Sequence, residues 1–127
     1  MAKTLNVVNS AYRCNAKEQD DPILWISHAL KNSGADVDVL LRGNAVNYAV
    51  KAQDASGLSF GGKTQGHPCD IVGDLKAYMG TGCQVYAVGD DLRERGLEGS
   101  VLIDGIKQVD RGGVAELFDS YDRIWSW

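Results

Sequence analysis

Three cysteines and two histidines are the side chains of this 127-residue chain best suited to nucleophilic or metal chemistry. Cys69 follows Pro68 at an expected helix start, where the helix dipole favours a thiolate. His67, two residues earlier, is a candidate base. Cys14 follows the first expected strand, and the neighbouring Arg13 would also favour a thiolate. Ordinary loop and helix-start cysteines are the favoured interpretation, and the alternative is a catalytic role for Cys69, then Cys14, with His67 assisting.

The third cysteine and the histidines do not indicate a metal site. Cys83 comes at the start of its expected strand, away from the edge where parallel sheets bind ligands, so we predict a small core residue. Structural zinc usually takes four ligands in paired short spacings, and His28, the other histidine, has no such neighbour. We predict no metal. An odd, irregularly spaced set of cysteines also argues against a disulfide framework and favours a reducing cytoplasm.

The segment GLSFGGKT, residues 57–64, matches the phosphate-loop pattern G-x-x-x-x-G-K-[ST] letter for letter. A phosphate loop joins a buried strand to a helix, however, and this segment follows an expected helix and polar residues. Gly66, His67 and Pro68 then interrupt any helix that would hold the phosphate. We therefore expect residues 54–67 to form an exposed loop, keep nucleotide binding as a minor alternative, and predict no cofactor.

Composition excludes several classes of function. Thirteen basic and seventeen acidic residues give a net charge of -4 without a basic cluster, which argues against general nucleic-acid binding. No apolar run approaches the roughly 18 residues of a membrane span. The N-terminus enters a strand-like pattern directly, without a secretion signal. We expect a cytoplasmic protein without nucleic-acid or membrane partners.

Alternating strands and helices must position the reactive side chains. Strands are expected over residues 4–9, 36–41, 83–88, 106–109 and 122–127. Helices are expected over residues 21–33, 44–53, 68–80 and 111–121, with a short helix over 91–95. Trp25 is a possible member of the first helix's apolar side. This βαβ rhythm predicts one domain over residues 1–127, with a mainly parallel five-stranded sheet covered by helices on both faces.

Ligands of open parallel sheets bind outside the carboxyl ends of the strands. The segments after Asn9, Leu41 and Val88 should meet there. We predict a ligand pocket from residues of these segments: Ser10, Tyr12, Asn44, Val88, Gly89, Asp90 and Asp91. For Asp90 and Asp91 a solvated helix start, with Asp91 as the cap, is favoured over an acidic rim for a cation or amine. Ordinary packing is likewise favoured for Tyr12.

The last third of the chain, residues 85–127, resembles the C-terminal half of DsrE/DsrF-like proteins. Sulfur-carrying members end the first strand of this stretch on a reactive cysteine, in patterns resembling C-G-x-C-x-x-x-R-G-[LI]. Here Gly89, Arg95 and Gly96–Leu97 match that pattern, while Val88 and Asp91 occupy its two cysteine positions.

The segment VDVLLRGNAVNYAVKAQ, residues 37–53, is also similar to this family's strand, Gly-Asp-Ala-Val-like turn and helix, with Asn44 replacing the aspartate. The resemblance implies a flavodoxin-like three-layer α/β/α domain in a homotrimer, homohexamer or mixed hexamer. Among catalytic members it implies a cysteine persulfide whose sulfur passes between sulfur-relay partner proteins. Trp125 and Trp127 share one face of the last expected strand, where edge packing is favoured and a subunit contact is the alternative.

Two functions follow from the resemblance. Because a valine cannot hold a persulfide, we favour a non-catalytic binding or assembly member of the family. The alternative is a sulfurtransferase that carries persulfide on a relocated cysteine, Cys69 or Cys14.

Overall fold

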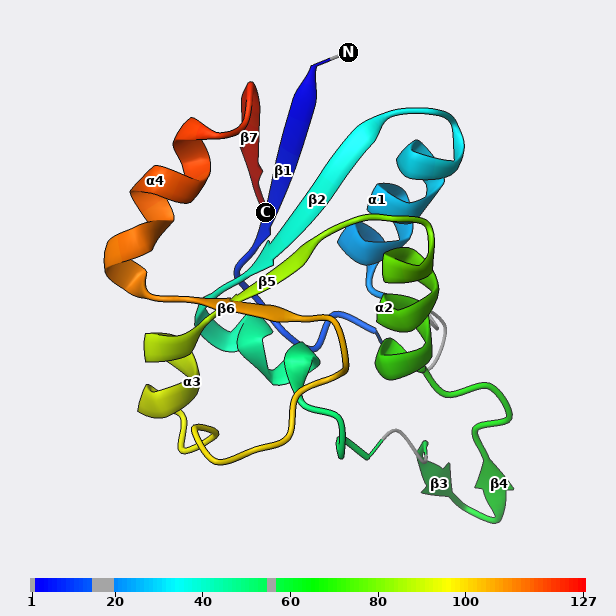
Figure 1. Ribbon diagram of the computed structural model, residues 1–127. Coiled ribbons are helices and arrows are strands. Elements are labelled where there is room, and N and C mark those ends of the chain that lie inside the picture. Colours follow the sequence, from blue (N-terminus) through cyan, green and yellow to red (C-terminus); the bar gives the residue numbers. More distant parts are fainter. Residues whose placement is uncertain (1, 15–19, 55–56) are drawn as a thin grey trace.

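The computed structural model describes residues 2–14, 20–54 and 57–127. Its main sheet has five strands in the order β6-β5-β2-β1-β7, and every pairing within it is parallel (Figure 1). The strands are β1 (Lys3–Val8), β2 (Asp36–Leu41), β5 (Val85–Val88), β6 (Lys107–Val109) and β7 (Arg123–Ser126). The predicted strands are confirmed to within about two residues, a normal uncertainty at element ends.

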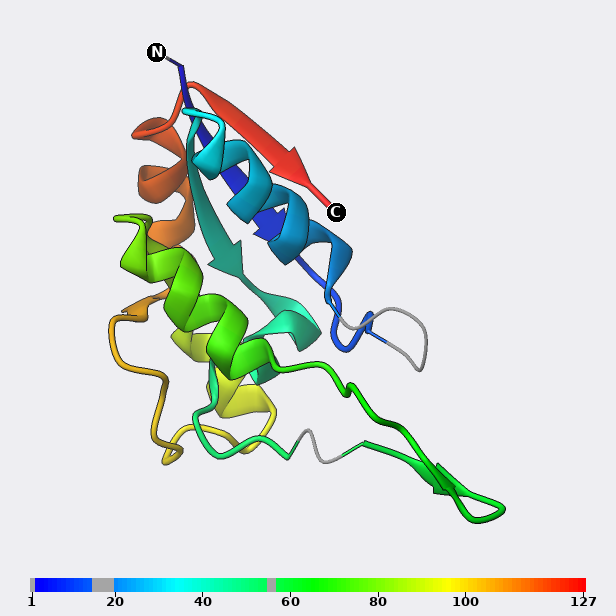
Figure 2. The ribbon, with the colours of Figure 1, turned by 90° about the vertical axis from the view of Figure 1, so that its right-hand side faces the viewer.

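Helices cover both faces of the sheet, so the fold is a flavodoxin-like three-layer α/β/α arrangement. Helices α1 (Pro22–Asn32) and α2 (Ile71–Gly80) lie on one face, and α4 (Val114–Asp119) lies on the other (Figures 1 and 2). The connections from β1 to β2, β5 and β6 all advance in one direction along the sheet, whereas the connection from β6 to β7 returns past them. Crossovers of a single hand that run in opposite directions place their helices on opposite faces.

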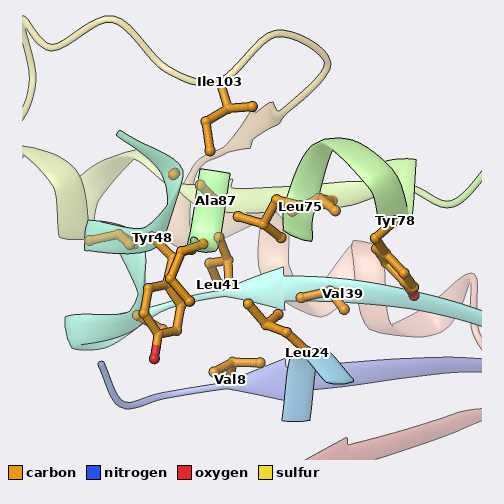
Figure 3. Packing of buried hydrophobic residues seen from close by; sticks show 14 of the residues in the cluster. Val8, Leu24, Val39, Leu41, Tyr48, Leu75, Tyr78, Ala87 and Ile103 are labelled. Atoms are coloured by element: carbon orange, nitrogen blue, oxygen red, sulfur yellow. The ribbon is translucent and has the colours of Figure 1, made fainter. Parts of the chain in front are cut away.

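Strand alternation divides the core between these two faces. Toward α1 and α2 the sheet presents side chains that pack with Leu24, Tyr48 and Leu75; these are Val8, Val39, Leu41, Val85 and Ala87 (Figure 3). Toward α4 it presents Leu5, Val7, Leu40 and Val88, which pack with Val114 and Tyr121. Val88 therefore points to the α4 face.

Helix α1 begins and ends as its sequence predicts, but its buried side is rotated. Asp21 is the N-cap and accepts hydrogen bonds from the backbone N–H groups of Ile23 and Leu24, while Pro22 occupies the first turn. Trp25, a suggested inward residue, is 58% exposed, and Leu24 is buried instead. Ser27 shares the buried side because its hydroxyl bonds to Asn6 of β1 and to the carbonyl of Ile23.

The predicted helix over residues 44–53 is instead a 3-10 helix, η1 (Gly43–Ala49). It stops early because the chain then pairs with residues 101–103: Lys51 donates to the carbonyl of Val101, and Ile103 donates to that of Ala49. Backbone groups committed to this pairing cannot continue a helix. The predicted helix over 111–121 is also divided, into a 3-10 helix η2 (Arg111–Gly113) and α4, because Gly112 and Gly113 are poor helix formers.

The glycine-rich stretch forms a β-hairpin that extends from the body of the molecule (Figure 2). Its strands are β3 (Ser59–Phe60) and β4 (Lys63–Thr64). Gly61 and Gly62 turn between them with φ of 54° and 76°, as a type I′ hairpin turn requires. The expected exposure is confirmed, positions 55 and 56 lie outside the described residues, and no helix follows the glycines as a phosphate loop needs. None of the described helices has the length and apolar character to cross a membrane.

Candidate functional site

A cavity of about 450 Å³ opens at the carboxyl edge of the sheet, on the α4 face. It is lined by residues that directly follow β1 and β2, by the end of β5, and by residues of α3 (Gly89–Glu94), η2 and α4. Its lining consists of Asn9, Arg42, Gly43, Val88, Asp91, Arg111, Val114, Ala115 and Phe118. The position where the family pattern has its first cysteine therefore faces a cavity of ligand size.

The carboxylate of Asp91 connects three of the elements that line this cavity. Its Oδ2 accepts a 2.7 Å hydrogen bond from the N–H of Gly43, and its Oδ1 accepts one of 2.5 Å from Nη2 of Arg111. Burial raises the pKa of Asp91, but the Gly43 N–H and the Arg111 guanidinium outweigh it and hold the pKa below its ordinary value. Arg111 also contacts Glu94 at 2.9 Å. Asp91 is therefore an ionised structural link between η1, α3 and η2.

The predicted helix-cap role of Asp91 is wrong. Helix α3 begins at Gly89 with Val88 as its N-cap, so Asp91 lies inside the first turn. From there its carboxylate reaches across the sheet edge to Gly43 instead of back to its own helix. The N–H of Gly43 can approach because the glycine has a φ of 59°, and an added Cβ would lie 3.1 Å from the carbonyl oxygen of Asn9.

Of the two arginines that line the cavity, Arg42 has the charge that is less compensated by neighbouring carboxylates. Its Nε donates a 3.0 Å hydrogen bond to Oδ1 of Asn9. Among the residues that the structure describes, Arg42 makes no ion pair, whereas Arg111 is paired with two carboxylates. With an apolar surface from Val88, Val114 and Phe118 opposite, the cavity combines one available cation with an apolar wall.

The other predicted pocket residues lie outside this cavity. Ser10 and Asn44 are exposed, and Oδ1 of Asn44 accepts a hydrogen bond from Nε of Arg95 at 2.9 Å. Asp90 is at the surface, where its carboxylate accepts from the N–H of Arg111 and so has a lowered pKa. Gly89 lies beside the side chain of Gln108.

Sequence reasoning missed Arg42 and Arg111 as cavity residues. Arg42 could have been found, because it is the first residue after a strand whose carboxyl end was already assigned to the binding edge. Arg111 gave no such signal, because its place depends on how η2 packs against α3.

A second cluster of polar and thiol groups surrounds Tyr12 and Tyr48. Cys14 and Cys69 are both half-buried and pack against the core cluster that contains Tyr48. The ring of Tyr12 packs edge-on against that of Tyr48 with centroids 4.9 Å apart. Tyr48 donates to Oδ2 of Asp21 at 2.6 Å and accepts from the N–H of Arg13 at 3.0 Å. Tyr12 therefore belongs to this cluster and not to the cavity near Val88.

The neighbouring Arg13 does not activate Cys14 as a thiolate. Burial, followed by electrostatic interaction with Cys69, raises the pKa of the Cys14 thiol to about 12. The backbone N–H of Arg13 donates to the hydroxyl of Tyr48. Burial is the main influence on the pKa of the Cys14 thiol. Cys14 keeps its proton at neutral pH.

The thiol pair and Val88 lie on opposite faces of the sheet. Cys14 and Cys69 pack against the core cluster beneath α1 and α2, whereas Val88 belongs to the cluster beneath α4. Cys83 is 5% exposed at the start of β5, which confirms its predicted core role. His67 is exposed, and among the described residues no group of three histidine, cysteine or acidic side chains is placed to hold a metal ion.

Neither a family model nor a curated protein sequence matches this chain. Its fold is similar to that of the ychN protein from E. coli, with a TM-score of 0.76 and 21% identity over all of both chains. It is also similar to two proteins of unknown function. MTH1491 from Methanobacterium thermoautotrophicum has a TM-score of 0.60 and 16% identity, covering 98% of this chain and 99% of that one. BT1422 from Bacteroides thetaiotaomicron has a TM-score of 0.62 and 15% identity, covering 98% and 95%. At these identities the similarity establishes the fold.

Proposed function

We propose that this protein is an oligomeric, DsrE/DsrF-like binding protein that no longer carries sulfur at the family's position. The observation that carries the proposal is Val88 in the lining of the cavity at the carboxyl edge. A valine has no atom that can accept sulfane sulfur. At the second cysteine position, the carboxylate of Asp91 already accepts hydrogen bonds from Gly43 and Arg111. The cavity lies where sulfur-carrying members of the family have their reactive cysteine, but its lining contains no cysteine. This supports the binding of a ligand without covalent chemistry.

The lining of the cavity favours a small ligand with an anionic group and an apolar body. Arg42 is the cation available to such a group, and Val88, Val114 and Phe118 offer apolar contact. Asp91 does not repel the ligand strongly, because its charge is compensated by Arg111. A charge-assisted hydrogen bond from Arg42 would orient the ligand with its apolar part inward.

Binding of the fluorescent sulfonate 8-anilinonaphthalene-1-sulfonate tests this proposal, since the probe joins an anion to an aromatic body. We expect saturable binding that Arg42→Ala weakens by about tenfold, as the loss of one charge-assisted hydrogen bond predicts. Ala115→Trp should also weaken it, because position 115 is exposed at the cavity and a larger side chain would obstruct entry.

Lys63→Ala is the matched control, because it removes the same charge from the exposed hairpin. Near-ultraviolet circular dichroism shows whether each variant keeps its tertiary packing. Equal affinity of the Arg42→Ala and Lys63→Ala variants would contradict a site at the cavity. Weaker binding by Lys63→Ala alone would instead support a ligand on the glycine-rich hairpin.

The second candidate function is a sulfur carrier on a relocated cysteine, and the free, only half-buried thiol of Cys69 just before the N-cap of α2 favours it. The protonated Cys14 leaves Cys69 as the thiol that would accept sulfane sulfur. Mass spectrometry after incubation with a sulfane donor would then show the mass of one added sulfur atom on Cys69.

A further inference from the structure

Arg42 and Arg111 both line the cavity, but the structure holds them in different ways. The guanidinium of Arg111 contacts Oδ1 of Asp91 at 2.5 Å and Oε1 of Glu94 at 2.9 Å, so two carboxylates compensate its charge. The guanidinium of Arg42 is held by a carboxamide instead, because its Nε donates a 3.0 Å hydrogen bond to Oδ1 of Asn9, which also lines the cavity. A neutral amide can fix the direction of a guanidinium without compensating its charge.

The carboxamide of Asn9 has its orientation fixed at both ends. Arginine Nε can only donate, so the amide oxygen must face Arg42. The amide nitrogen donates at 2.8 Å to Oγ of Ser126, the last residue of β7, and at 3.1 Å to the carbonyl oxygen of Trp127. The reverse orientation would lose the bonds to Arg42 and Trp127, because a carbonyl oxygen can only accept. From its place directly after β1, Asn9 therefore connects the residue after β2 to the end of β7, the strands on the two sides of β1.

We propose that Asn9 is a positioning residue of the cavity and that it makes the end of β7 part of the ligand site. Its amide oxygen holds Nε of Arg42, and no residue that the structure describes makes a hydrogen bond or an ion pair with the two terminal nitrogens of Arg42. Those nitrogens can bind an anionic group through two parallel hydrogen bonds. This inference rests on the proposed function, and it specifies a ligand with a single negative charge, since one of the two arginines is uncompensated.

The advantage of this arrangement is that Arg42 is oriented before the ligand arrives. A long side chain that must be immobilised by its ligand weakens binding, and Asn9 has already immobilised Arg42 in the free protein. The backbone does not depend on the Asn9 side chain, because the N–H of Arg42 donates to the carbonyl of Val8 and the N–H of Trp127 to that of Val7, both at 3.0 Å. A substitution of Asn9 should therefore loosen the Arg42 side chain without unpairing the strands.

Binding of 8-anilinonaphthalene-1-sulfonate to single and double variants tests this role. Asn9→Ala should weaken binding by about fivefold, because the probe must then immobilise Arg42 itself. In an Arg42→Ala background the same substitution should have no further effect, since Asn9 acts through Arg42. Asn9→Asp should weaken binding by about tenfold, as Arg42→Ala does, because its carboxylate keeps the bond to Nε but compensates the charge. Asn44→Ala is the matched control, since Oδ1 of Asn44 also accepts from an arginine Nε, that of Arg95 at 2.9 Å, outside the cavity.

Nuclear magnetic resonance of the isotope-labelled wild-type protein supplies a readout that needs neither the probe nor a folded variant. The Nε–H proton of Arg42 should exchange with water at least about tenfold more slowly than that of Arg123, an exposed arginine of β7. Asn9→Ala should remove this protection, and Asn9→Asp should keep it.

Fast exchange of the wild-type Arg42 proton would overturn the proposal, and so would a further loss of affinity when Asn9→Ala is added to Arg42→Ala. The failure of the proposed function is recognised separately. Equal probe affinity of wild type and Arg42→Ala would overturn the proposed function and this inference with it. The expected effect of Arg42→Ala, together with no effect of Asn9→Ala, would overturn the role of Asn9 alone.

Discussion

The two carboxylate oxygens of Asp21 accept hydrogen bonds from two different parts of the chain. Oδ1 caps α1 by accepting from the N–H groups of Ile23 and Leu24, and Oδ2 accepts from the hydroxyl of Tyr48. Both Asp21 and Tyr48 are fully buried, so neither side chain can replace a lost partner with water. Burial and the bond to Asp21 raise the pKa of Tyr48, which keeps its hydroxyl protonated as a donor.

Tyr48→Phe should therefore lower the free energy of unfolding by about 1–3 kcal/mol, because it leaves a buried carboxylate oxygen and the N–H of Arg13 without their partner. Urea denaturation followed by circular dichroism measures this change. Tyr86→Phe is the matched control, since Tyr86 is only partly buried beside the α4 face. An equal effect of the two substitutions would show that the Asp21 bond adds no special stability.

At the scale of elements, the beginning of α2 meets the end of the segment that leads into α1. Asp74 in the first turn of α2 lines the same small cavity as Asp20, with the N-cap Asp70 nearby. Burial, followed by the charges of Asp20 and Asp70, raises the pKa of Asp74 from 3.8 to about 6. Between about pH 4 and pH 6 the folded protein thus holds a proton that the unfolded chain has released, and stability falls as the pH rises through that window.

Asp74→Asn should stabilise the protein at pH 7 by about 1 kcal/mol, a value reduced for the partial exposure of the group, because it removes the repulsion while an amide N–H can still donate to Asp20. The gain should disappear near pH 4, where the wild-type carboxyl is already protonated. Thermal unfolding at both pH values measures it. Asp119→Asn removes the same charge on the other face of the sheet, and a similar gain from that variant would contradict the local explanation.

At the scale of the whole molecule, the sheet ends on a strand that carries two large aromatic side chains. Trp125 and Trp127 of the β7 edge are 41% and 45% exposed. Trp125 is in register with Asn6, and Nε1 of Trp127 donates to Oδ1 of Asn6, so both indoles lie on the α1 side of the sheet. Edge strands with exposed apolar groups are common sites of subunit association. We propose that this edge contributes to a trimer or hexamer.

Sedimentation velocity should then give a particle several times heavier than the 13.7 kDa chain. Trp125→Ser should shift the distribution toward smaller species, because it removes part of the proposed contact. Trp25→Ser, at an exposed position of α1, removes the same kind of side chain from another surface and should not. A monomeric wild-type protein would contradict the proposed association directly.

Much of this architecture could be read from local pattern alone. The expected range 21–33 closely matches α1 with its Asp21 cap, the apolar runs marked the strands, and the position of Cys83 marked it as core. These features depend on hydrogen bonds and side-chain alternation within a few residues, which a sequence displays openly. The same locality explains why Val88 could be placed at the end of a strand.

The candidate sites, in contrast, depend on contacts between distant parts of the chain. Asp91 contacts Gly43 and Arg111 instead of capping its own helix, η1 ends where the chain pairs with residues 101–103, and Tyr48 donates to Asp21. Each of these contacts is selected by how helices pack on the two faces of the sheet, and no periodicity encodes that choice. The residue types were therefore visible in the sequence, whereas the face on which each one acts was decided by tertiary packing.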